Sequence, residues 1–501
     1  MRRDIPAAVD VGGTGSRAEA AGGGGTEGLT GRPFGQRSLR PLVGVLAAMA
    51  MALTGTRISV VALPWFVLVT TGSATQTGLV VFCEMTPYVV VKALTGPLVD
   101  RIGPRTVSWA ADVASATAAA VVPLLHLLGL LSFPVLLALV AVIGAARGPG
   151  DLAKEVMVPE AAERGAVRLE RATGVSGVIE RLAATAGPAV GGSLVALLGP
   201  MAGLSVNAAC FALGSVIIGL ALPRGMGLAV PPEREPTGAG AAASGAGAGG
   251  APGARGARGA CASREVGESS DGPGYWQRFG EGFAFLRREP LLLSLTVMVG
   301  ITNLLDAAVS MVLIPVWANA SGGGPEAIGL LGSAMGAGAV AGSLIATAVA
   351  HRLRRRATVL TGFLLCGAPR FLVLGVDLPL GAVIAVFVLS GFGAGFVNPV
   401  LAAILFERVP RRLLGRVNAL GDALAWSGIP LGALLAGAAV AGAGLTPVLL
   451  TGAVAYFLTT NLAGLAHPAR VWARQRQRRP RTSAGPPRDN GALSPARSSR
   501  A

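Results

Sequence analysis

Charged residues are scarce in this sequence. They make up 14% of the 501 residues, against about 25% in typical soluble proteins, whereas hydrophobic residues make up 52% and the mean hydropathy is +0.61. Apolar segments of about 20 residues, the length that a helix needs to cross a bilayer, recur along most of the chain and leave no room for a large soluble domain. The composition therefore predicts an integral membrane protein that has the lipid bilayer as a partner.

Lysine, histidine and cysteine are also rare. Neither Lys92 nor Lys154 follows a GxxxxG sequence, which excludes a Walker A loop and therefore ATP as the energy source within this chain. The three histidines and four cysteines are scattered, so we expect no metal, no other cofactor and no disulfide framework, and an enzyme is disfavoured. The net charge of +16 does not predict nucleic-acid binding, because the basic residues lie in short segments between apolar runs.

Sustained apolar windows predict twelve membrane spans. In the first half of the chain they lie near 41–70, 76–98, 106–128, 131–147, 173–198 and 201–222. In the second half they lie near 291–317, 327–350, 357–376, 379–405, 417–440 and 445–466. The expected fold class is an all-α polytopic membrane protein with twelve transmembrane helices in two pseudo-symmetric six-helix bundles.

The basic residues alternate between connections. Residues 1–40 hold six arginines, and Arg147 and Lys154 fall in the predicted connection between the fourth and fifth spans, whereas the odd-numbered connections hold no arginine or lysine. Since cytoplasmic loops carry the positive excess, we expect both termini and the central loop in the cytoplasm. Arginine outnumbers lysine 40 to 2, which is typical of a high-GC bacterial coding bias, so the expected location is the bacterial inner membrane.

The chain divides into five predicted regions. They are a disordered cytoplasmic tail (1–40), an N-terminal six-helix bundle (41–222), a Gly- and Ala-rich cytoplasmic linker (223–290), a C-terminal six-helix bundle (291–466) and an Arg-rich disordered cytoplasmic tail (467–501). At the end of the linker, Trp276, Phe279, Phe283 and Leu286 recur at helical spacing. This pattern predicts an amphipathic helix on the inner membrane surface or, alternatively, an extension of the seventh span.

The two halves also repeat. Asp100 aligns with His351 and Arg105 with Arg356 at an offset of 251 residues (351 − 100). The pair at 158–159 and the pair at 409–410, both Val-Pro, give the same offset (410 − 159). Internal repeats of this kind are typical of secondary transporters, in which the binding site lies near the midplane where the halves meet.

One connection carries a motif of known type. Its residues are Gly96, Asp100, Arg101, Gly103 and Arg105. The segment resembles the signature loop of the major facilitator superfamily, G-x-x-x-D-R-x-G-x-R, although Pro104 and Thr106 stand where basic residues are usual and His351 replaces the acid in the second half. The resemblance implies a cytoplasmic latch around Asp100 that is closed in the outward-facing state and breaks on inward opening. An ordinary basic loop is the alternative.

The fifth span carries a second motif. Its residues are Gly187, Pro188, Gly191 and Gly192. They resemble the G-P-x-x-G-G core associated in this superfamily with drug and proton antiporters, and they can form a hinge or a close helix contact. Simple packing is the alternative. Longer segments between 40 and 466 resemble the subgroup that includes enterobactin exporters and macrolide-efflux proteins.

Several charged residues fall inside predicted spans. A lone charge at a helix centre costs ~2.5 to 3.5 kcal/mol on insertion scales, so each needs a partner or a cavity. We expect those nearest the cytoplasmic ends to reach the surface or join the latch; they are Asp112, Glu180, Arg181 and Asp422. The candidates for proton or substrate coupling are Arg57, Glu84 and Asp306, because a carboxylate in a cavity can exchange a proton as access alternates. For each of them a structural ion pair is the alternative.

These observations predict a secondary active transporter. It would export a small organic molecule, such as an antibiotic, a siderophore or a lipophilic cation, in exchange for protons by alternating access, and it would act as a monomer. An importer on the same fold is one alternative. A membrane receptor or scaffold without transport is the other.

Overall fold

The computed structural model describes residues 38–224, 226, 275–349, 354–410 and 413–465, and every regular element in these ranges is a helix. The predicted tails and most of the predicted linker lie outside them. The first half contains α1 (Arg40–Thr71), α2 (Ala74–Leu94), α3 (Gly96–Ile102), α4 (Pro104–Leu127), α5 (Phe133–Arg164), α6 (Leu169–Leu198) and α7 (Pro200–Ala221).

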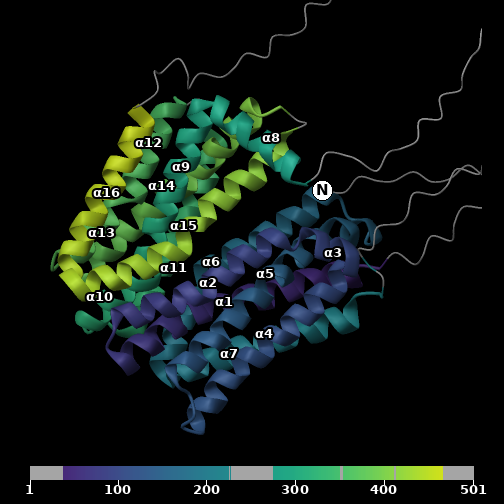
Figure 1. Ribbon diagram of the computed structural model, residues 1–501, viewed down its shortest axis with the longest axis horizontal. Coiled ribbons are helices and arrows are strands. Elements are labelled where there is room, and N and C mark those ends of the chain that lie inside the picture. Colours follow the sequence, from purple (N-terminus) through teal and green to yellow (C-terminus); the bar gives the residue numbers. More distant parts are fainter. Residues whose placement is uncertain (1–37, 225, 227–274, 350–353, 411–412, 466–501) are drawn as a thin grey trace, which may run out of the picture. The chain divides into compact units, whose positions relative to one another are not determined.

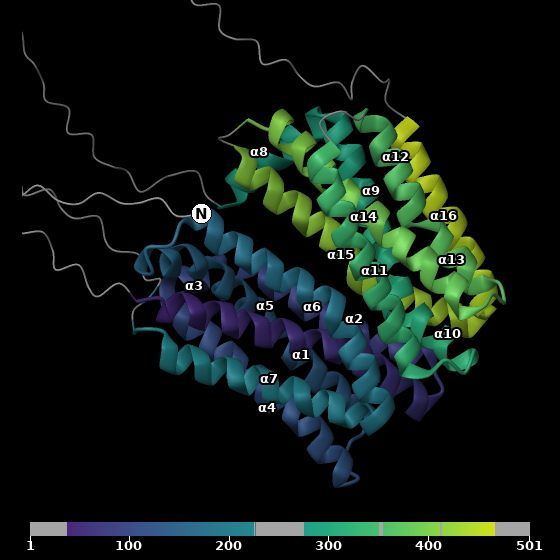
Figure 2. The same ribbon diagram turned by 180° about the vertical axis from the view of Figure 1, so that it is seen from behind.

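The second half begins with a short helix and continues with six further spans. Its elements are α8 (Tyr275–Arg288), α9 (Pro290–Ala308), the π-helical turn η1 (Val309–Leu313), α10 (Ile314–Ala320), α11 (Gly324–Val349), α12 (Arg355–Cys366), α13 (Ala368–Gly375), α14 (Leu380–Arg408), α15 (Leu414–Ala443) and α16 (Leu445–Leu465). Figures 1 and 2 show the helices of the two halves as two groups, coloured purple to teal and green to yellow.

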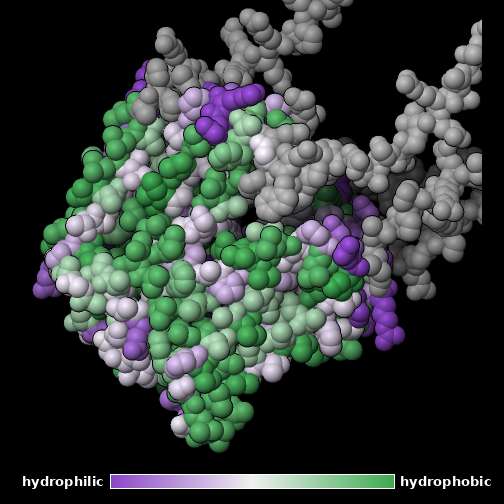
Figure 3. All heavy atoms as spheres, viewed as in Figure 1, coloured by the Kyte–Doolittle hydropathy of each residue, from purple (hydrophilic) through white to green (hydrophobic). Residues whose placement is uncertain are grey.

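Within the described residues, twelve helical segments are long and apolar enough to cross a membrane, as the sequence predicted. Hydrophobic side chains cover much of the face shown in Figure 3, and hydrophilic side chains gather mainly near the ends of the helices. Helices suit this environment because their backbone groups are satisfied internally where no water is available. The chain is a multi-pass membrane protein.

The fourth span is much longer than predicted. The predicted fourth span ended near 147, but α5 continues through Gly148-Pro149-Gly150 to Arg164 with Pro149 inside the helix. Membrane helices tolerate such prolines because neighbouring helices and local adjustments satisfy the freed backbone groups. As a consequence Arg147 and Lys154 are buried helix residues, and their assignment to a loop was wrong.

The two halves repeat in their packing. A Cβ atom added at Gly144 of α5 would lie 2.0 Å from the carbonyl oxygen of Glu84 on α2, and one added at Gly391 of α14 would lie 1.9 Å from that of Met335 on α11. The two helix pairs therefore approach each other in the same way. Their offsets are 251 residues for α2 and α11 (335 − 84) and 247 for α5 and α14 (391 − 144). The duplication is confirmed, but its offset changes along the chain.

Arg105 and Arg356 are equivalent in the structure as well. Arg105 donates hydrogen bonds from Nε to the carbonyl oxygen of Leu222 and from Nη2 to that of Gly219, each at 3.0 Å. Arg356 donates from Nε to the carbonyl oxygen of Gly464 at 3.2 Å. Each guanidinium thus satisfies carbonyl groups at the C-terminal end of the last helix of its own half, where a cation is favourable.

The second alignment on which the repeat was based does not correspond in space. Val158 and Pro159 lie inside α5, whereas Val409 and Pro410 follow the end of α14 at Arg408. The fourth spans of the two halves, α5 and α14, correspond at an offset of 247 residues. The offset of 251 residues between the two Val-Pro pairs is therefore a coincidence.

The most extensive contacts between the halves are made by two helix pairs, α2 with α15 and α6 with α11. In the first pair, the Thr75 hydroxyl donates to the carbonyl oxygen of Gly437 at 3.2 Å. In the second, the Ala189 amide donates to the Ser333 hydroxyl at 2.9 Å. Both pairs approach closely at glycines, as at Gly192 on α6. We call the end of the helices where α1 begins and the α2–α4 connection lies the basic end, and the opposite one the far end. These contacts lie in the half nearer the far end.

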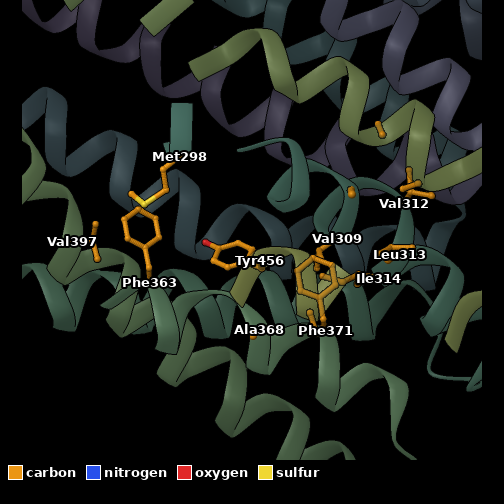
Figure 4. Packing of buried hydrophobic residues seen from close by; sticks show 14 of the residues in the cluster. Met298, Val309, Val312, Leu313, Ile314, Phe363, Ala368, Phe371, Val397 and Tyr456 are labelled. Carbon is orange, nitrogen blue, oxygen red and sulfur yellow. The ribbon is translucent and has the colours of Figure 1, made fainter. Parts of the chain in front are cut away.

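The core of the second half is aromatic and aliphatic. Figure 4 shows Phe363, Phe371 and Tyr456 among the aliphatic residues of this core. Leu286 of α8 is only 1% exposed and joins the same core. The backbone leaves the helical conformation at Glu289 before α9 begins, so α8 is not an extension of the seventh span. Its location on a membrane surface stays a prediction.

Candidate functional site

A cavity of about 340 Å³ lies between the halves. Six elements line it: α1, α2, α5 and α6 from the first half, and η1 and α15 from the second. Its polar or aromatic lining residues are Thr56, Arg57, Tyr88, Lys92, Arg147, Asp151, Lys154, Glu155, Ser176, Glu180 and Trp426. Sites for small organic molecules have volumes of roughly 300 to 1,000 Å³ and combine apolar walls with a few polar groups. The cavity therefore has the size and lining of a small-molecule site.

Glu84 lies beside this cavity in a buried ion pair. Its Oε1 accepts a hydrogen bond from Arg147 Nη1 at 3.0 Å, and the two side chains are 9% and 7% exposed. The Arg147 guanidinium also lies 4.4 Å from the centre of the Tyr88 ring and 4.0 Å from Asp151 Oδ2. One cation thus organises an acid and an aromatic ring of α2 and an acid of its own helix, α5.

Arg57 of α1 lines the same cavity and interacts electrostatically with Glu180 of α6. Its helix can approach α6 closely because Gly187 faces it. A Cβ atom at Gly187 would lie 2.5 Å from Arg57 Cβ. Arg57 and Arg147 therefore line one cavity, and Glu84 is not a lining residue but is paired with Arg147 at its wall.

Asp306 lies elsewhere, in the second half. It accepts a charge-assisted hydrogen bond from Arg370, whose side chain is fully buried, while 33% of the Asp306 side chain is exposed. The π-helical turn η1 begins three residues after Asp306, and α12 breaks at Gly367, three residues before Arg370. Such π-helical turns are frequent at functional sites. Asp306 is not among the residues that line the cavity described above.

Aromatic rings from the two halves stack at the cavity wall. The centres of the Tyr88 and Trp426 rings are 6.1 Å apart, with an angle of 22° between their planes. The Lys92 amino group lies 5.3 Å from the centre of the Trp426 ring and 3.4 Å from Glu155 Oε1. Because cations are attracted to aromatic faces, Lys92 adds to this contact between α2 and α15.

The predicted latch motif forms α3 and the start of α4. Gly96 begins α3, and Gly103 connects the two helices with a φ of +90°. Asp100 and Arg101 are exposed, and Asp100 has no ion-pair partner among the residues that the structure describes. Arg105 is the predicted latch residue whose side chain has recorded hydrogen bonds, and these go to carbonyl oxygens at the end of α7. Latch closure stays a prediction.

The glycine motif of the fifth span lies at two helix interfaces. Gly187 and Gly191 face α1, where a Cβ atom at Gly191 would lie 3.0 Å from Ile58 Cα. Gly192 faces α11, where a Cβ atom would lie 2.6 Å from the carbonyl oxygen of Pro325. Pro188 also packs against α11, since a Cβ atom at Gly332 would lie 2.8 Å from its ring. The motif lets α6 pack closely against its own half and against the other half at once.

Sequence reasoning missed one ion pair completely. Asp112 was expected to reach the surface, but its carboxylate is 3% exposed and accepts a hydrogen bond from Lys154 Nζ at 2.7 Å. Lys154 itself was counted as a loop residue. The spacing of four residues between Arg147, Asp151 and Glu155 is a helical signal across the Gly-Pro-Gly segment, and it could have revealed that α5 continues.

Comparison with known families agrees with this arrangement of helices. The family model of the Major Facilitator Superfamily matches residues 45–305 and 296–499. The matched regions cover most of the chain, so it belongs to the major facilitator superfamily and is a membrane transporter. This confirms the resemblance found in the sequence.

Named relatives align with most of this chain. The chain is 29% identical over 429 residues to the multidrug efflux pump Tap of Mycolicibacterium fortuitum, with 83% of this chain and 95% of the relative covered. It is also 29% identical to the multidrug efflux pump Tap of Mycobacterium tuberculosis (strain ATCC 25618 / H37Rv), with 82% and 91% covered.

Solved structures share the fold. The nucleoside transporter NupG superposes with a TM-score of 0.60 at 14% identity, covering 86% of this chain and 98% of its own. A bacterial homologue of the human lysosomal transporter Spinster, in an inward-facing and unoccupied conformation, gives a TM-score of 0.61 at 13% identity, with 87% and 98% covered. At these identities the likeness shows the fold alone.

Proposed function

We propose that this transporter exports a small organic molecule from a bacterial cell in exchange for protons, as a monomer in the cell membrane with both termini in the cytoplasm. The single observation that carries the proposal is the cavity between the halves, which is lined by Arg147, a buried guanidinium paired with the Glu84 carboxylate behind it. Export is favoured over import because the relatives that align with this chain along most of their length are described as multidrug efflux pumps.

Glu84 and Asp306 are the proposed coupling carboxylates. Each is held by an arginine, Arg147 or Arg370, so proton uptake by the acid would weaken the pair and change which helices are held together. Arg57 would take part through its electrostatic interaction with Glu180, which lines the same cavity. Since the two ion pairs belong to different halves, their breakage and re-formation can be linked to rocking of one half against the other.

The same proposal assigns a conformation to the structure. The exposed Asp100, without an ion-pair partner among the described residues, is the state expected of an open latch at the basic end. The contacts of α6 with α11 near Gly192, and of α2 with α15 near Gly437, support a closed far end. The structure would then represent the form that is open to the cytoplasm.

Energised inside-out vesicles test the function. Compounds from a broad efflux panel should evoke proton movement when the chain is present, and Glu84→Gln or Asp306→Asn should abolish it. Glu160→Gln and Asp377→Asn are matched controls, because these carboxylates are exposed or partly exposed, and they should leave proton movement unchanged.

Other results would lead to other conclusions. Proton movement that is unchanged in both test variants would remove Glu84 and Asp306 from the coupling mechanism. Accumulation of a compound inside cells that express the chain would indicate import. A complete lack of movement for every compound would favour a receptor or scaffold.

A further inference from the structure

The Asp112–Lys154 pair lies outside the coupling groups proposed above, yet it borders the same cavity. Lys154 lines the cavity, whereas Asp112 lies behind it between α4, α5 and α7. The pair is buried, with side chains that are 3% and 2% exposed. A water-filled transport cavity would therefore be separated from the Asp112 carboxylate by a single lysine side chain.

The carboxylate is only partly satisfied. Its Oδ1 accepts a hydrogen bond from Lys154 Nζ at 2.7 Å, but Oδ2 is buried and has no hydrogen-bond partner among the described residues. The hydroxyls of Ser108 and Ser115, one turn away on either side along α4, are also buried and find no hydrogen-bond partner in the described part of the chain. Unpaired buried polar atoms are costly, so a group that can gain a proton here has a reason to do so.

Few other charges act on this carboxylate. The charges on α5 that act on Asp112 are the positive charge of Lys154 and the negative charge of Asp151. From α7 the neighbour is Gly214, where an added Cβ atom would lie 3.2 Å from Oδ2, and α7 has no acidic or basic side chain. Arg105 and His126, the other ionisable residues of α4, lie at the two ends of the helix.

The second half shows what the fold needs at this place. Ala111 of α4 lies against Gly150 of α5, where an added Cβ atom would be 3.1 Å from the Ala111 Cβ. In the second half Gly362 of α12 lies against Val397 of α14 in the same way. The offsets, 251 (362 − 111) and 247 (397 − 150), are those of the other packing contacts that repeat.

By these offsets Asp112 corresponds to Phe363 and Lys154 to Leu401. Phe363 is 7% exposed and lies in the hydrophobic core, and Leu401 packs against the same core. The duplicated helix pair therefore packs with ordinary apolar side chains. Because burying an ion pair carries a desolvation cost that apolar residues avoid, the charges in the first half call for a role other than packing.

We propose that Asp112 is a proton-binding site and that Lys154 reports its state to the cavity. A proton that reaches Asp112 through the cavity converts the carboxylate to a neutral acid, and no other bond is made or broken. The Lys154 ammonium then loses its counter-charge and moves into the cavity, where it adds one positive charge to the wall and opposes a cationic substrate. For this last consequence the inference rests on the proposed proton-coupled export.

The chain is suited to a direct test because Lys92 and Lys154 are its only lysines. The purified protein in nanodiscs is treated briefly with N-hydroxysuccinimidyl acetate at a series of pH values, and acetylation of each lysine is quantified by mass spectrometry. Acidification lowers the reactive fraction of both amines by the same factor, so the Lys154-to-Lys92 ratio reports access to Lys154. As the pH is lowered, the Lys154-to-Lys92 ratio should rise by up to about tenfold for each pH unit, because the protonated fraction of Asp112 rises by the same factor.

Two variants complete the test. Asp112→Asn should give a high ratio that does not change with pH, and Glu160→Gln, which removes a carboxylate at the surface of α5, should behave like the unsubstituted chain. A ratio that does not change with pH in the unsubstituted chain would overturn the proposal, and this result does not depend on the folding of any variant. A rise at low pH that persists in Asp112→Asn would also overturn it. Labelling requires neither substrate nor gradient, so a flat ratio in a chain that still exports would reject this inference alone.

Discussion

The two halves of this transporter share a scaffold but differ in their buried charges. The scaffold repeats down to single glycines, since Gly144 and Gly391 bring α5 and α14 equally close to α2 and α11. Among the described residues, α5 of the first half takes part in two ion pairs in which both side chains are less than 10% exposed, from Arg147 to Glu84 and from Lys154 to Asp112. By the packing offsets, Met335, Ala394, Phe363 and Leu401 occupy the equivalent positions in the second half.

This difference separates features that both halves share from features that only one half has. Backbone approach at the repeated glycines is needed in both halves because a side chain there would push the helices apart. The charged pairs of α5 have no charged counterpart at the equivalent positions of the second half. The second half instead has the Asp306–Arg370 pair, between α9 and α13, next to a π-helical turn. Four predictions test this division.

The largest effect is expected from breaking one buried ion pair. Lys154→Met leaves the Asp112 carboxylate, 3% exposed, without a counter-charge and should cost about 3 to 5 kcal/mol of stability. Arg370→Met should cost less, because a third of the Asp306 side chain remains accessible. Thermal unfolding of the two purified variants, followed by the loss of monodisperse protein, measures the difference. Equal losses would contradict the assignment of greater burial to the first pair.

A smaller and symmetric effect is expected from the repeated glycines. Gly144→Ala and Gly391→Ala each place a Cβ atom about 2 Å from a backbone oxygen of the facing helix, so the helices must separate. Overpacking of this kind costs about 1 to 3 kcal/mol. Gly174→Ala is the control, because no atom lies within 4 Å of its added Cβ. A fall in melting temperature for only one of the two variants, Gly144→Ala or Gly391→Ala, would show that the close helix approach is not equally important in both halves.

The capping arginines should show a graded effect. Arg105→Met removes two hydrogen bonds to the end of α7, whereas Arg356→Met removes one to the end of α16. We expect losses of about 1 kcal/mol per hydrogen bond, with the larger fall in melting temperature for Arg105→Met. A larger fall for Arg356→Met would mean that contacts other than these bonds determine the stability of the two helix ends.

The smallest effect on stability is expected from making the first half resemble the second. The double variant Asp112→Leu with Lys154→Met removes both charges, so its stability should stay within about 1 kcal/mol of the unsubstituted chain. The pH dependence of export should nevertheless change, because the proposed proton site is gone. Export assays in vesicles at several pH values check this. A normal pH response in the stable double variant would assign the pair to structure only.

Much of the fold could be predicted from the sequence, but little of the site. The twelve spans and the motif around Asp100 were found because each is a local pattern of hydropathy or of spacing. The predicted end of the fourth span near 147 was wrong, because Gly148-Pro149-Gly150 has the composition of a turn but continues α5 in this protein. That one error removed Arg147 and Lys154 from the buried charges and left Glu84 and Asp112 without visible partners.

The sequence by itself determined that this chain crosses a membrane twelve times as two related halves, because the transfer of each apolar segment into lipid depends on that segment alone. Only the tertiary structure decided which charges meet. In the three pairs Asp112–Lys154, Glu84–Arg147 and Asp306–Arg370, the partners are 42, 63 and 64 residues apart in the chain. Their pairing depends on how helices rotate and pack against one another, and this information is not present in any single span.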